Sequence, residues 1–135
     1  MARHLALTAP LMGLAVWAAP IRAEEQDALL SAWTAPSGQA VALYDRVSEP
    51  EVAQVRYRFV APGLAQQHYD TVAPDLPWLC TNVALPDLRA QGLAADMVVI
   101  SVGDRVVPLG QMDAEAVQYF DAFRITDGTC NLEVF

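Results

Sequence analysis

Alternating apolar and polar residues mark two strands early in the chain. In 39–48 the apolar residues fall on odd positions, with Asp45 the polar exception; they are Val41, Leu43 and Val47. In 52–61 the odd positions are again apolar: Val55, Tyr57 and Phe59. Successive side chains of a strand point to opposite faces, so both segments are predicted strands with one buried face. The turn at Pro50 predicts that they form an antiparallel hairpin.

The segment 70–83 has a helical spacing instead. Its apolar residues mostly recur three or four positions apart, as one helical face requires: Val72, Leu76, Leu79, Cys80 and Val83. A proline is comfortable only in the first turn of a helix, so Pro74 and Pro77 place the regular part from about Asp75. The pattern predicts a short helix that Pro86 ends, with one further turn at 87–91.

The rest of the chain returns to strand patterns. The run 96–102 is the most β-prone of the chain and predicts a central strand, followed by an extended or edge piece at 106–109. Segments 117–126 and 129–135 alternate, and Asp127-Gly128 between them is a strong signal for a two-residue hairpin.

These elements predict the order β-β-α-β-β-β in a single domain over 39–135. The fold class is therefore α+β, with a small, mainly antiparallel sheet and one short helix packed on it. Residues 24–38 end in the breaker cluster 34–38 and are interpreted as a loose leader whose Trp33 packs on the domain.

The first 23 residues form a predicted signal peptide. Basic Arg3 and His4 precede the uncharged stretch 5–19, and Ala23 supplies a small residue before acidic Glu24. The stretch is shorter than the ~20 residues that span a bilayer, which argues against a membrane anchor. We expect a periplasmic or secreted protein with no stable membrane insertion after cleavage.

The chain has two cysteines, Cys80 and Cys130. In an exported chain we expect them to form one structural disulfide between the helix and the last strand. Two buried free thiols and a redox pair are the alternatives, and a redox pair lacks support because no Cys-x-x-Cys spacing occurs.

Charge narrows the classes of partner. From residue 24 onward, six arginines and no lysine stand against sixteen acidic residues, a net charge of −10. A surface this acidic excludes nucleic acid and anionic membrane as partners that bind by bulk attraction. The partner stays unknown; a periplasmic protein or a small ligand is compatible with this charge.

Four stretches of the chain resemble known proteins. They are YFDAFRITDGTC (119–130), RYRFVAP (56–62), Ser37-Gly38-Gln39, and Cys80 with Ala84-Leu85-Pro86. They resemble a family of small exported alphaproteobacterial proteins, a domain of unknown function that covers nearly all of the chain after residue 23. The resemblance implies a signal peptide, a single domain and paired cysteines, and it assigns no catalytic residues.

Some members of that family carry the label acetolactate synthase, which the present sequence does not support. Such enzymes hold thiamine diphosphate through Gly-Asp-Gly and a downstream Asn pair. The chain offers Gly103-Asp104-Arg105 and a lone Asn131. Arginine stands where the glycine is needed, so we expect no cofactor.

Candidate chemistry is sparse. His68 is the one histidine after residue 23, and with Asp70 and Asp75 it could bind a metal or serve a small hydrolase, although a lone histidine in a polar loop is typically solvated. No serine lies in a Gly-x-Ser-x-Gly turn. We predict no catalytic and no metal-binding residues.

One basic cluster stands out in this acidic chain. Arg56 and Arg58 share the outward face of a predicted strand, and Arg46 is expected across from them. The cluster could bind a carboxylate or phosphate group. Cross-strand pairing with acidic side chains is the favoured alternative.

The leading functional hypothesis is a non-enzymatic binding or interaction module of the periplasm. A small hydrolase or metal-dependent enzyme that uses His68 is the second. The third is an envelope assembly or inhibitor factor that binds another protein through a strand edge.

Overall fold

The structure is a computed structural model that describes residues 32–134 together with Pro10, Gly13 and Ala15. Most of the predicted signal peptide, residues 24–31 of the predicted leader and Phe135 lie outside the described residues. None of the helices within the described part is long and apolar enough to cross a membrane.

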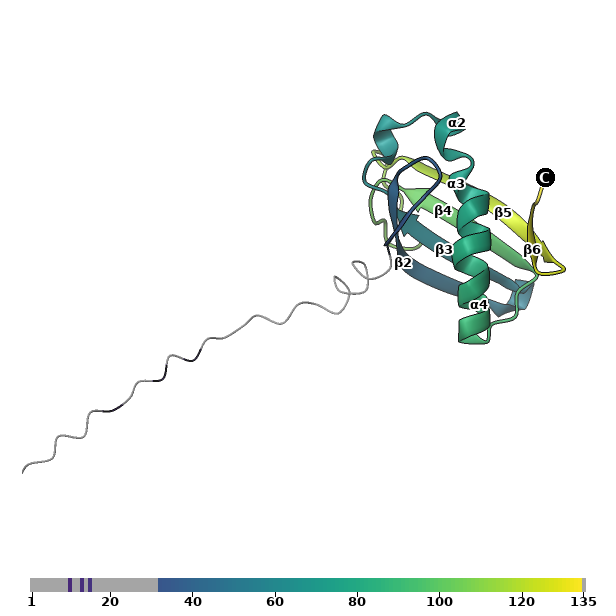
Figure 1. The fold of residues 1–135 in the computed structure, drawn as a ribbon, viewed down its shortest axis with the longest axis horizontal. Coiled ribbons are helices and arrows are strands. Elements are labelled where there is room, and N and C mark those ends of the chain that lie inside the picture. Colours follow the sequence, from purple (N-terminus) through teal and green to yellow (C-terminus); the bar gives the residue numbers. More distant parts are fainter. Residues whose placement is uncertain (1–9, 11–12, 14, 16–31, 135) are drawn as a thin grey trace, which may run out of the picture.

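A six-stranded sheet forms the body of residues 32–134, and its strands lie side by side in sequence order (Figure 1). The strands are β1 (Ala32–Thr34), β2 (Ala40–Glu49), β3 (Gln54–Val60), β4 (Met97–Gly103), β5 (Gln118–Thr126) and β6 (Thr129–Leu132). Neighbours pair antiparallel except β3 and β4, which are parallel. The predicted α+β class and mainly antiparallel sheet are confirmed.

The connection from β3 to β4 crosses one face of the sheet as a helix (Figure 1). Two short turns, η2 (Leu64–Gln66) and α2 (Tyr69–Val72), lead into α3 (Asp75–Leu79), η3 (Cys80–Ala84) and α4 (Leu85–Gln91). A helical crossover of this length brings the chain back to start the next strand in the same direction, which is why β3 and β4 are parallel. The pattern of the sequence alone did not predict this parallel pair.

The helix is longer than predicted, because Pro86 does not end it. In η3 the ladder widens to a π turn, where the N–H of Leu85 donates to the carbonyl of Cys80. Pro86 follows at once in the first turn of α4, where its missing N–H is tolerated. The helix ends at Gly92, whose φ of 64° turns the chain so that the N–H of Leu93 donates to the carbonyl of Leu88.

Alternation in the central strands builds the core between the sheet and the helix. On β3 every second residue is almost completely buried, as predicted: Val55, Tyr57 and Phe59. The central strand β4 is buried along nearly its whole length, and Val98, Ile100 and Val102 join the same core. The helix contributes its apolar face from Leu76 to Leu88, and β5 adds Phe123. Burial of this apolar surface is the main favourable term in folding.

The predicted strand order was wrong at the N-terminal edge. Ala32–Thr34, within the segment interpreted as a loose leader, forms β1 and pairs with β2. Trp33 packs edge-on against Phe59 at 6.2 Å between ring centroids, which explains why this segment joins the sheet. The predicted extended piece at 106–109 is not a strand but part of the loop that joins β4 to β5.

Cys80 and Cys130 form the predicted disulfide. It joins η3, in the middle of the helix, to the edge strand β6, with a sequence separation of 50 residues. Cys80 is fully buried, so the bond anchors the C-terminal edge of the sheet to the core.

Candidate functional site

A β-bulge in β2 separates the three arginines that the sequence placed together. The register shifts between Leu43 and Asp45, which leaves Tyr44 as an extra residue opposite β3. Beyond the bulge Arg46 pairs with Tyr57 and therefore lies on the helix-bearing face, whereas Arg56 and Arg58 lie on the other face. The expectation that Arg46 faces these two residues was wrong.

Arg46 takes part in a network between the sheet and α4. Its Nε and Nη2 donate to Asp87 at 2.7 and 3.1 Å, and the hydroxyl of buried Tyr57 donates to Asp87 Oδ2 at 2.7 Å. Burial, and then the hydrogen bond to the carboxylate, raise the pKa of Tyr57 well above its usual range. The same carboxylate raises the pKa of Arg46. This network fixes α4 on β2 and β3.

Arg58 lies inside the structure rather than at its surface. Its side chain is 8% exposed and forms an ion pair with Asp45 at 3.0 Å. The guanidinium also donates to the carbonyl of Val107 and lies 5.0 Å from the centre of the Tyr44 ring. Arg58 therefore holds the bulge of β2 and the β4–β5 loop in place.

None of the three arginines offers an open anion site. Arg56 pairs with Glu49 at 3.3 Å, so each of the three already binds a carboxylate. For Arg56 and Arg58 the acid lies on the neighbouring strand, which is the cross-strand pairing favoured from the sequence.

His68 and its acidic neighbours do not converge. His68 and Asp70 are exposed, whereas Asp75 is 2% exposed and accepts hydrogen bonds from the N–H and hydroxyl of Ser37. Within the described residues no group of three or more His, Cys, Asp or Glu side chains is placed to hold a metal.

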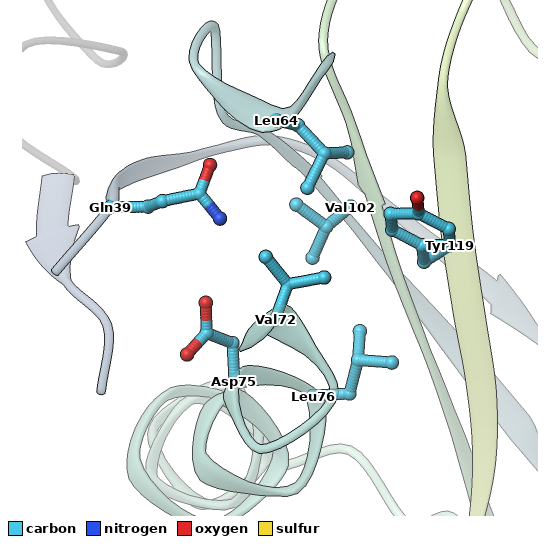
Figure 2. Close-up of a pocket in the computed structure, with 7 residues that line it drawn as sticks. All are labelled: Gln39, Leu64, Val72, Asp75, Leu76, Val102 and Tyr119. Atoms are coloured by element: carbon cyan, nitrogen blue, oxygen red, sulfur yellow. The ribbon is translucent and has the colours of Figure 1, made fainter. Parts of the chain in front are cut away.

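A small cavity lies at the carboxyl ends of the parallel strands β3 and β4, next to α2 (Figure 2). The space open to the centre of a water molecule is about 10 Å³. Three lining residues have polar side chains and four have apolar ones: Gln39, Asp75, Tyr119, Leu64, Val72, Leu76 and Val102. We call it the Gln39 cavity.

Gln39 is the unusual member of this cavity. It is 9% exposed, and neither Nε2 nor Oε1 of its side chain has a hydrogen-bond partner within the described residues. Figure 2 shows the carboxamide directed toward the cavity, with the Asp75 carboxylate on the same side. The sequence did not single out Gln39, because a glutamine beside a strand is ordinarily solvated.

On the face of the sheet opposite the helix, one exposed aromatic residue stands in a surface whose other apolar members are buried or half-buried. We call it the Phe120 surface; its apolar members are Met97, Val99, Phe120 and Ala122, on the adjacent strands β4 and β5. Phe120 is 67% exposed beside Val99, which is 6% exposed. These residues line a hollow of about 260 Å³ together with Arg56 and Glu133.

Ion pairs form the rim of the Phe120 surface. Arg124 binds Glu133 through two hydrogen bonds of 2.9 and 3.1 Å, and Arg56 binds Glu49. The hydrogen bonds from the Arg124 guanidinium lower the pKa of the Glu133 carboxyl, so this ion pair persists as pH falls below neutral. An aromatic side chain in an apolar floor with a charged rim is the usual anatomy of a protein interface.

Comparison with known proteins yields one family. The family described as "Family of unknown function (DUF6497)" matches residues 14–135. The chain belongs to this family. No curated protein and no solved structure matches it.

Membership confirms the resemblance to a domain of unknown function. It transfers no activity, ligand or site residue to this chain. The alphaproteobacterial origin and the acetolactate synthase label of some members stay predictions from the resemblance.

Proposed function

We propose that the protein is an exported, non-enzymatic binding module that engages a protein partner through the Phe120 surface. The observation behind this proposal is the exposed ring of Phe120 on a sheet face that the helix leaves uncovered. An exposed aromatic residue on an apolar floor is the kind of residue that contributes most to binding energy when a partner buries it.

Charge indicates the chemistry of the partner. Residues 32–134 contain six arginines and thirteen acidic residues. Within the described part, five of the arginines are in ion pairs, whereas six carboxylates have no ion-pair partner: Glu51, Asp70, Asp75, Asp96, Asp121 and Asp127. The uncompensated charge is therefore negative, which favours a partner that presents an apolar side chain flanked by Lys or Arg and disfavours a second copy of this chain.

Export is part of the same proposal. The predicted signal peptide and the Cys80–Cys130 disulfide support it, because disulfides persist in oxidising compartments. The partner is accordingly a protein of the cell envelope or the medium.

Site-specific photocrosslinking in living cells tests the surface. A benzoyl-phenylalanine is placed at Phe120, at Leu132 on the edge strand β6, or at Tyr69 on α2, all of them exposed. We expect one defined adduct from position 120 and none from position 69. An adduct from position 132 alone would favour binding through the strand edge, and the absence of an adduct at 120 would refute the proposal.

Binding of the purified partner then tests the chemistry. Phe120→Ser should weaken binding about tenfold or more, since truncation of a central interface aromatic costs roughly 2 kcal/mol. Val52→Ser is the matched control, because Val52 is 63% exposed on η1 (Pro50–Val52), outside the Phe120 surface. Affinity should also fall as salt rises, and affinity indifferent to salt would contradict a basic partner.

A further inference from the structure

The Gln39 cavity combines a small, partly open space with a buried amide that lacks hydrogen-bond partners among the described residues. Two polar atoms of one buried side chain, Nε2 and Oε1, have no hydrogen bond within the described residues. Buried polar groups in native proteins are almost always paired, and an orphan group usually indicates a bound water or ion. The Gln39 amide therefore points to an occupant of the cavity.

Size limits that occupant to one heavy atom. The space open to a water centre, about 10 Å³, is close to that of a single water. Apolar side chains form most of the wall, so a hydrated metal ion would find too few oxygen ligands. Larger organic molecules do not fit without movement of Leu64 or Val72, which belong to η2 and α2.

The polar wall suits water in particular. A buried water typically needs two to four polar partners. Gln39 offers one donor, Nε2, and one acceptor, Oε1, while the Asp75 carboxylate offers a further acceptor. Asp75 is in turn fixed by the N–H of Ser37 at 2.9 Å, so the acceptor is held in position.

We propose that the Gln39 cavity is a binding site for one structural water that bridges the Gln39 amide and the Asp75 carboxylate. Gln39 directly precedes β2, and Asp75 begins α3. The water therefore links the turn before β2 to the start of the crossover helix, at the point where η2 and α2 cover the carboxyl ends of β3 and β4. This site is independent of the Phe120 surface.

Water-oxygen magnetic relaxation dispersion on the full-length mature protein tests the proposal. The wild type should show a long-lived internal water, and Gln39→Leu should lose one such water while it keeps its fold by circular dichroism. Gln67→Leu is the control, because Gln67 is exposed and its substitution should leave the signal unchanged. An atomic-resolution crystal structure of the wild type gives the same answer if Gln39→Leu does not fold.

Three results would overturn the proposal. One is a wild type with no long-lived water, or a crystal structure with an empty cavity. Another is a long-lived water signal that Gln39→Leu leaves unchanged. The third is an ammonium ion at the site, shown by stabilisation with ammonium chloride that sodium chloride does not give and Gln39→Leu abolishes.

Discussion

At the scale of single residues, the structure pairs five of the six arginines of residues 32–134 with an acid, and two other side chains carry the proposals. Gln39 is buried and its amide has no hydrogen-bond partner among the described residues, and Phe120 is aromatic and exposed. Both depart from the usual preference of polar groups for water and apolar groups for the core. Departures of this kind are concentrated at functional sites, including binding sites.

The alkaline stability of the protein should depend on Tyr57. Its folded pKa lies above its unfolded value of about 10, so the folded state keeps a proton that the unfolded state loses at high pH. The stabilisation is complete below pH 10 or so and is lost as pH rises through the folded pKa. Tyr57→Phe should cost about 1 kcal/mol at neutral pH, through the lost hydrogen bond to Asp87, and flatten the alkaline decline.

Urea unfolding of both proteins between neutral and alkaline pH measures this difference. Tyr44→Phe is a suitable control, since the Tyr44 hydroxyl forms no hydrogen bond within the described residues and lies outside the Asp87 network. An alkaline decline as steep in Tyr57→Phe as in the wild type would contradict the assignment.

At the scale of elements, tertiary contacts decide three features that local pattern predicts poorly. The π turn carries the helix past Pro86, the bulge at Tyr44 moves Arg46 to the helix side, and Trp33 recruits β1 to the sheet. In each case packing against another element outweighs a local tendency. Pro86 would otherwise end the helix, β2 would alternate without a bulge, and the segment around Trp33 would stay outside the sheet.

Of the individual links between elements, the disulfide should contribute most to the free energy of unfolding. Cys80 and Cys130 close a loop with a separation of 50 residues. In the chain-entropy model such a loop stabilises the fold by about 4 kcal/mol. Replacing both cysteines with alanine, which leaves no unpaired thiol, should lower the free energy of unfolding by about that amount.

Urea unfolding of the double variant and of the wild type, each with and without reductant, checks this value. Reductant should shift the wild type toward the variant and leave the variant unchanged. A variant as stable as the oxidised wild type would show that packing around Cys80 and not the covalent bond fixes β6 to the helix.

At the scale of the whole molecule, the helix covers one face of the sheet, and acidic residues outnumber basic ones sixteen to eight. The Phe120 surface lies on the other face, and the net charge of −10 from residue 24 onward opposes association between copies at neutral pH.

Low pH should remove the electrostatic repulsion between copies of this chain. As pH falls toward the isoelectric point, about 4.4 for the full 135-residue chain, the repulsion between copies vanishes and the Phe120 surfaces can meet. We expect a monomer at pH 7 and reversible self-association near pH 4.4, reduced in Phe120→Ser, by light scattering. Val52→Ser is the control and should associate as the wild type does. If Phe120→Ser also associates as strongly as the wild type near pH 4.4, the Phe120 surface is excluded as the contact.

The sequence by itself determined the class of the fold, the central strands and the cysteine pair. Alternation at Val55, Tyr57 and Phe59 is dictated by strand geometry, and two cysteines allow one intramolecular pairing. Such features depend on local period or on composition, so they can be deduced without knowledge of the neighbours in space.

Only the tertiary structure decided which face each residue occupies and which residues meet. The hydrogen bonds of Ser37 to Asp75, which begins α3, place Gln39 beside Asp75, and the bulge separates Arg46 from Arg56 and Arg58. The exposure of Phe120 follows from the choice of face that the helix covers. These outcomes depend on contacts between distant segments, and a one-residue change of register reverses them, so local pattern cannot fix them.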